Sequence, residues 1–142
     1  MKILVINGPN INLLGEREPE LYGKQSYRDL LVLCENTCRD LGAICITFQS
    51  NHEGAIVDVI QQAAKDNVDA IVINAAAYSH TSVAILDALK AVDIPAVEVH
   101  VTDPKTREEF RHIDYVGMAC EKVVAGFGID GYKQAIEYLV KG

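Results

Sequence analysis

The sequence predicts an α/β protein whose strands form one parallel sheet. Short runs of apolar, β-branched residues alternate along the chain with stretches of helical periodicity. The length of 142 residues suits one domain with a full hydrophobic core. Because no repeat, low-complexity tract or linker divides the chain, we expect a single domain over residues 1–142.

Five strands are expected, at residues 2–7, 43–49, 70–75, 96–101 and 122–127. Helices are expected at Tyr27–Leu41, Gly54–Asn67, Thr81–Val92 and Gly131–Val140, with a less regular turn within 106–120. Gly42 and Pro95 stand where the first and third helices should end. Strands that alternate with helices form parallel sheets covered on both faces, so this pattern fits a flavodoxin-like three-layer sandwich with strand order 2-1-3-4-5.

Composition argues against several classes of function. The chain has 13 Lys and Arg against 20 Asp and Glu, and its net charge of −7 repels nucleic-acid phosphates and anionic membranes. The four cysteines form no C-x-x-C pair and no zinc-spaced cluster with histidine, so we expect no metal site and no redox chemistry. The opening MKILVINGPN has the pattern of a strand and not of a signal peptide, which predicts a cytoplasmic protein.

One connection is longer than a sheet needs. From Gly8 to Gln25 the chain shows no strand pattern, although βα loops usually take about 2 to 6 residues. Its INLL stretch is compatible with one helical turn, and the whole segment could be a plain surface excursion. In the predicted order, however, it follows the first strand at the topological switch point, where open α/β sheets bind ligands.

Polar side chains interrupt the fourth strand, which should be covered on both faces. Glu98, His100 and Thr102 share one side, with valines on the other. Because an unpaired buried charge costs several kcal/mol, we expect Glu98 to hold His100 in one tautomer, which is a general acid/base arrangement. An isolated E-x-H could equally be a structural pair. The ends of the first and third strands bring Asn10, Asn74 and His80 to the same crevice, which favours the functional interpretation.

Other readings stay open at this point. Asn10 and Asn74 are also common turn residues, and Ser79 to Ser82 could simply cap a helix. Arg107 and Arg111 would share one face if their segment were helical, as a solvated charge ladder also would. The sequence has no G-x-G-x-x-G after the first strand and no phosphate-binding P-loop motif, while a bound flavin or a catalytically silent domain remains compatible with this fold.

Several motifs together resemble the type II 3-dehydroquinate dehydratase family. They are GPNINLLGEREPELYG at 8–23, QSNHEG at 49–54, INAAAYSHTS at 73–82, EVH at 98–100, REEFRH at 107–112 and GFGIDGY at 126–132. The resemblance implies one catalytic domain that dehydrates 3-dehydroquinate to 3-dehydroshikimate, in the shikimate pathway or in quinate catabolism. It further implies anti elimination through an enolate, with no cofactor, metal or Schiff base.

By the same resemblance, five residues would carry the chemistry. Tyr22 would remove the proton and Arg17 would lower its pKa, since a nearby cation favours phenolate. Asn10 would hold the water that stabilises the enolate. His100, oriented by Glu98, would protonate the leaving hydroxyl.

The resemblance also implies how the substrate is held. Its carboxylate would be bound by Asn74, Thr102 and the backbone around Val101, and its ring hydroxyls by His80, Asp87 and Arg111. Asp87 would come from a neighbouring subunit, because the family forms trimers packed into dodecamers. This chain departs from the family at Thr102-Asp103, at Lys105-Thr106, at Leu86 and at Ala76, and Asp103 adds a negative charge near the expected carboxylate pocket.

Overall fold

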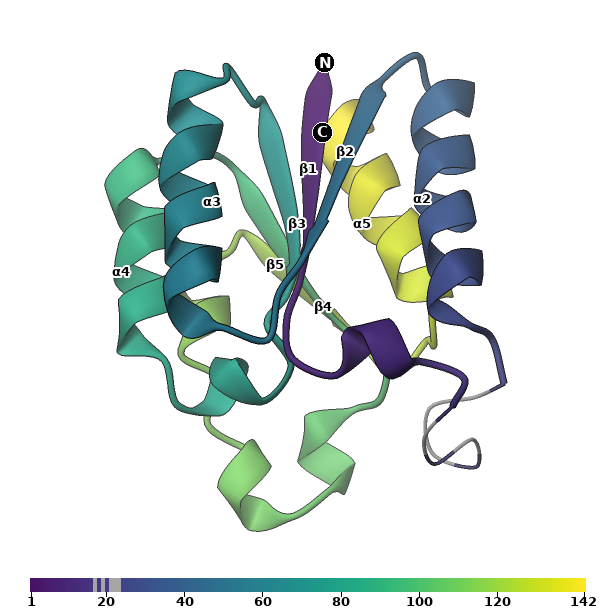
Figure 1. Cartoon of the computed structure of the whole chain (residues 1–142), viewed down its shortest axis with the longest axis vertical. Helices are drawn as coiled ribbons and strands as arrows, with labels where there is room; N and C mark the ends of the chain where they lie inside the picture. Colours follow the sequence, from purple (N-terminus) through teal and green to yellow (C-terminus); the bar gives the residue numbers. More distant parts are fainter. Residues whose placement is uncertain (17, 19, 21–23) are drawn as a thin grey trace.

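The computed structural model of the chain describes every residue except 17, 19 and 21–23. Its sheet contains the parallel strands β1 (Lys2–Asn7), β2 (Ile44–Gln49), β3 (Ala70–Asn74), β4 (Ala96–His100) and β5 (Lys122–Ala125). The strand order β2-β1-β3-β4-β5 confirms the predicted order 2-1-3-4-5. Figure 1 shows helices α3 (Glu53–Lys65) and α4 (Val83–Val92) on one face of the sheet, and α2 (Tyr27–Asp40) and α5 (Asp130–Lys141) on the other.

Each face of the sheet has its own apolar core. Because side chains alternate along a strand, Ile3 and Val5 of β1 pack toward α2 and α5, whereas Leu4 and Ile6 pack toward α3 and α4. Leu30, Cys34 and Cys38 of α2 meet Tyr132 and Ile136 of α5 in the first core. Ile56, Ile60, Ile85 and Leu89 fill the second. One parallel sheet with helices on both faces confirms the predicted three-layer sandwich.

Some element ends differ from the predicted bounds for local reasons. The helix expected from Thr81 begins at Val83, because the Ser82 hydroxyl caps it by accepting the Ile85 N–H at 2.9 Å. The last strand ends at Ala125, because Gly126 has a φ of +87° and turns the chain. In place of the turn predicted within 106–120, the chain forms separate 3₁₀ turns, η3 (Pro104–Thr106), η4 (Glu109–Arg111) and η5 (Val116–Ala119).

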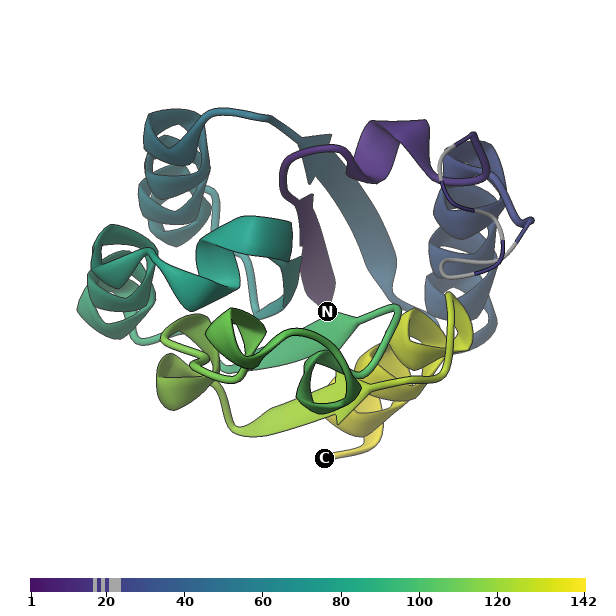
Figure 2. The ribbon, with the colours of Figure 1, turned by 90° about the horizontal axis from the view of Figure 1, so that it is seen from below.

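The carboxyl ends of the strands carry most of the irregular structure. The turns η1 (Ile11–Leu13), η2 (Ala76–His80), η3 and η4 gather at this edge, which Figure 2 shows from below. The turn η1 confirms the helical turn expected in the INLL stretch. Among the described residues, no helix is both long enough and apolar enough to cross a membrane.

Candidate active site

A cavity of about 160 Å³ opens at the carboxyl edge, between the segment after β1 and the segment after β4. Most of the candidate residues from the sequence lie in its wall. They are Asn10, Asn74, His80, His100, Val101, Thr102 and Arg111. The parallel sheet explains this convergence, because the ends of β1, β3 and β4 are neighbours at one edge.

Strand β4 places a carboxylate and an imidazole side by side below this cavity. Val97 and Val99 point into the core under α5, so Glu98 and His100 point to the opposite face. Glu98 is 0% exposed and His100 is 7% exposed. The pairing of these two side chains agrees with the expectation from the E-x-H pattern.

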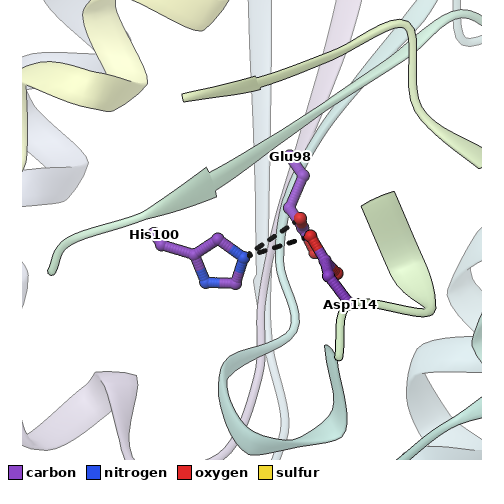
Figure 3. A group of neighbouring side chains, drawn as sticks. All are labelled: Glu98, His100 and Asp114. Carbon is purple, nitrogen blue, oxygen red and sulfur yellow. Dashed lines mark ion pairs between the residues drawn. The ribbon is translucent and has the colours of Figure 1, made fainter. Parts of the chain in front are cut away.

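A second carboxylate, which the sequence patterns did not reveal, faces the same imidazole. Nε2 of His100 lies 3.0 Å from Oε1 of Glu98 and 3.7 Å from Oδ2 of Asp114 (Figure 3). Neither contact is aligned as a hydrogen bond, so the groups are held together mainly by charge. Because Nε2 faces the carboxylates, Nδ1 is the ring nitrogen left for a ligand in the cavity.

The three groups shift one another's pKa values. Burial raises the pKa of Glu98 to about 7, although the neighbouring His100 opposes this shift. For His100, burial disfavours the imidazolium, but the carboxylates of Asp114 and Glu98 outweigh it and raise the pKa to about 9. Burial opposes ionisation of Asp114, but its interactions with His100, Glu98 and the Gly117 N–H lower its pKa to about 2. His100 is therefore a protonated acid near neutral pH.

Neighbouring turns fix both carboxylates. The buried Ser79 hydroxyl in η2 donates to Oε2 of Glu98 at 2.9 Å. The backbone N–H of Gly117 donates to Oδ1 of Asp114 at 2.9 Å. The N–H of Tyr115 donates to the Ser79 carbonyl at 2.8 Å, so these two turns are tied to each other.

His80 lies beside His100 at the wall of the cavity. The two rings are stacked, with centroids 6.2 Å apart and planes at 15°. Nδ1 of His80 is 2.8 Å from the carbonyl oxygen of Ile113, which fits a donating N–H at that atom. That contact leaves Nε2 of His80 for a ligand.

Asn74 is held by a buried network that the sequence patterns also missed. Tyr132 of α5 is 0% exposed, and its hydroxyl donates to Oδ1 of Asn7 at 2.6 Å. The same hydroxyl accepts from Nδ2 of Asn74 at 2.9 Å, and Oδ1 of Asn74 accepts the Ala76 N–H at 3.0 Å. One N–H of the Asn74 amide is left for the cavity.

The segment after β1 is braced by the end of β2. Asn10 has a left-handed backbone with φ of 70°, and its N–H donates to Oδ1 of Asn51 at 3.1 Å. Nε2 of Gln49 lies within hydrogen-bond distance of the Gly8 carbonyl at 3.2 Å and of Oδ1 of Asn12 at 3.3 Å. The QSN stretch therefore supports the cavity wall from behind.

Two arginines and an aspartate follow β4. Arg107 and Arg111 both line the cavity, although their segment forms separate turns instead of one helix. Nε of Arg111 donates to Oε1 of Glu108 at 2.8 Å. Oδ1 of Asp103 accepts the Lys105 N–H at 3.0 Å, so this carboxylate, which departs from the family pattern, caps the start of η3.

Two predicted site residues in the described part of the chain do not line the cavity, Glu98 and Asp87. Glu98 is buried within β4 and contacts the lining residue His100. Asp87 is exposed on α4. Tyr22 and Arg17 lie outside the described residues. Within the described part of the chain, one polar side-chain atom each of Glu98, His100 and Asp114 lies within 4.8 Å of the others.

Comparison with known proteins identifies the class to which this fold and cavity belong. The family "Dehydroquinase class II" matches residues 1–140, and the chain belongs to that family. A "Catabolic 3-dehydroquinase 1" of Fusarium vanettenii is 50% identical over 98% of this chain and 96% of its own. A "3-dehydroquinate dehydratase" of Lachnoclostridium phytofermentans is 50% identical over 99% of this chain and 97% of its own. The crystal structure of the type II dehydroquinase from Butyrivibrio crossotus superposes with a TM-score of 0.96 at 47% identity, covering 98% of this chain and 97% of that one.

Proposed function

We propose that this protein is a hydro-lyase that dehydrates 3-dehydroquinate to 3-dehydroshikimate. Membership in the class II dehydroquinase family over residues 1–140 is the observation that carries this proposal. The cavity supports it, because a protonated imidazole and several hydrogen-bonding groups surround a space about the size of a small ring. The elimination needs an acid for the leaving hydroxyl, and His100 supplies one.

His100 acts as that acid in the proposed mechanism. Its Nε2 faces Glu98 and Asp114, so proton donation falls to Nδ1 on the cavity side. A pKa raised to about 9 keeps the ring protonated at neutral pH, ready to donate. Glu98 fixes the ring and compensates its charge.

The base and its helpers come from the segment after β1. By family resemblance we assign the proton abstraction to Tyr22, the lowering of its pKa to Arg17, and the water at the enolate to Asn10. Asn10 supports this assignment, since it lies in the cavity wall on a braced backbone. No metal or Schiff base enters this mechanism.

Substrate binding is assigned on the same basis. Asn74, Thr102 and the backbone around Val101 would hold the carboxylate, and one amide N–H of Asn74 remains for it. His80 and Arg111, which also line the cavity, would bind the ring hydroxyls.

Asp87 completes the site from a neighbouring subunit in this proposal. Its side chain is exposed and outside the cavity of its own chain, as a residue that serves another subunit would be. We therefore propose a homo-oligomer, with trimers packed into a dodecamer. A mixed assembly of Asp87→Ala and Tyr22→Phe chains should regain activity that each variant lacks alone. Confirmed mixed oligomers without activity would contradict shared sites.

The family leaves two metabolic roles, the shikimate pathway and quinate catabolism. The two relatives described above, one named catabolic and the other not, are each 50% identical to this chain, so identity does not separate the roles. We also propose a cytoplasmic location, where free thiols such as Cys45 and Cys120 stay reduced.

The decisive experiment is the dehydration assay. Purified protein mixed with 3-dehydroquinate should produce the ultraviolet absorbance of the conjugated enone, and the rate should survive EDTA and borohydride. Tyr22→Phe should lose kcat by orders of magnitude and still bind substrate, because it removes an interaction of the transition state. Tyr138→Phe, which alters a half-exposed ring, is the matched control. A yellow, flavin-loaded protein or an inert colourless one would refute the proposal.

A further inference from the structure

We propose that Asp114 is a positioning residue that, together with Glu98, orients the His100 imidazole toward the cavity, and that position 117 must be glycine to admit it. This inference rests on the proposed function, in which His100 donates the proton. It concerns a residue outside the motifs that carry the family resemblance.

The geometry of the trio carries the first step. Glu98 approaches Nε2 of His100 from within β4, at 3.0 Å, and Asp114 approaches the same atom from the turn before η5, at 3.7 Å. Figure 3 shows both carboxylates on the same side of the ring. Two elements of the fold thus hold one nitrogen, which directs the other nitrogen away from them and toward the cavity.

Asp114 is itself held in place. Its Oδ1 accepts the Gly117 N–H at 2.9 Å, and its side chain is only 28% exposed. A carboxylate tied to backbone cannot turn to solvent without losing that bond. The side chain is therefore fixed toward His100.

Gly117 is required for space and not for backbone conformation, because its φ is not in the left-handed region. A Cβ at this position would collide with the carboxylate of Asp114 and would lie 3.0 Å from Oε1 of Glu98. Any larger residue would push one of the two carboxylates off His100. Asp114 and Gly117 are thus a coupled pair.

The two carboxylates favour the protonated, positively charged form of His100. The buried Glu98 carboxylate and the partly buried Asp114 carboxylate repel each other unless a positive charge lies between them, and the imidazolium of His100 provides that charge. Other polar and charged groups surround the trio at greater distance. Ser79 donates to Glu98, the His80 ring stacks on His100, and Arg107 and Arg111 lie in the cavity wall. Both carboxylates interact electrostatically with the Cys120 thiol. Lys122 and Asp103 line a second cavity that Asp114 also lines.

The test uses Asp114→Asn, which removes the charge and keeps an oxygen for the Gly117 N–H. The pKa of His100 is measured by NMR titration of its ring protons, assigned by their loss in His100→Gln. We expect the pKa to fall by about 1 to 2 units, as on removal of one nearby opposite charge. We expect kcat at alkaline pH to fall by about tenfold or more, with KM changed less than about twofold. Gly117→Ala should act in the same direction.

The control is Glu109→Gln, which removes an exposed negative charge from a neighbouring turn and should leave the His100 titration unchanged. Circular dichroism and urea unfolding establish that each variant is folded. An unchanged His100 pKa in Asp114→Asn would overturn the inference, and so would a lowered pKa with an unchanged pH profile of kcat. Failure of the dehydratase assay in the unmodified protein would instead refute the proposed function, because the NMR titration does not depend on turnover.

Discussion

Tyr132 offers a sharp test of how the sheet edge is held together. Its hydroxyl lies in the core and serves two amides at once, by donating to Oδ1 of Asn7 and accepting from Nδ2 of Asn74. Tyr132→Phe removes only one oxygen, so the ring still fills its place. Both amide atoms would then lie among apolar side chains without this partner.

The expected loss of stability follows from the two amide atoms that would be left without this hydrogen-bond partner. An unsatisfied buried donor or acceptor costs about 1 to 3 kcal/mol, so two of them predict a free energy of unfolding lower by about 2 to 6 kcal/mol. Nδ2 of Asn7 also has no hydrogen-bond partner among the described residues, so the Asn7 amide would keep neither of these two bonds.

Urea unfolding followed by far-ultraviolet circular dichroism measures the loss, since the chain contains no tryptophan. Protein concentration must be equal in all samples, because assembly would add to the apparent stability. Tyr138→Phe is the matched control. Its ring is 39% exposed and stays over Lys122, so we expect a change under about 0.5 kcal/mol. A loss below about 1 kcal/mol in Tyr132→Phe, at an unchanged unfolding slope, would refute this account of the network.

Three further outcomes are expected. Ser79→Ala should lower the free energy of unfolding by about 1 to 3 kcal/mol, because Oε2 of Glu98 loses its donor; an unaltered urea midpoint would contradict this. Gly8→Ala should cost more than about 2 kcal/mol, because the new Cβ would lie 2.5 Å from the Ala75 carbonyl oxygen, and a stable, well-expressed variant would show that the backbone yields there. The pKa of His100 is raised from 6.5 to about 9, so its stabilising contribution is complete below pH 6.5 and is lost as the pH rises through 9. The free energy of unfolding of His100→Asn should therefore vary less between these pH values than that of the unmodified protein. Parallel plots of unfolding free energy against pH for the two proteins would contradict this prediction.

The parts of the fold that the sequence predicts well are those governed by local periodicity. The apolar run of β1 and the alternation of β4 predict strands, and the succession of strands and helices predicts the order of the sheet, which is confirmed. The same alternation places Glu98 and His100 on one face, because residues two apart in a strand must share a side. Buried Cys34 and Cys38 likewise follow from a helical spacing of four.

The structure of residues 102–120 could not be predicted in detail, because their apolar residues follow neither the helical nor the strand periodicity. This segment forms three short 3₁₀ turns, of which η3 is capped by Asp103 and η5 has its Gly117 N–H bound by Asp114. Asp114 therefore looks like any acidic turn residue in the sequence. Only the return of the chain from η4 toward β5 brings it to His100.

The role of the Tyr132 hydroxyl cannot be predicted from the sequence, because its partners lie far away along the chain. It bonds to residues 125 and 58 positions away, so no window of the sequence contains the pair that matters. Its position in a helical pattern indicates an apolar core residue, and the ring does occupy the core. The hydroxyl, however, joins the end of β1 to the end of β3, the two strands whose loops carry Asn10 and His80. A side chain whose sequence position indicates only packing thus orients Asn74, which lines the cavity, and the loss of its hydroxyl should affect the site through Asn74.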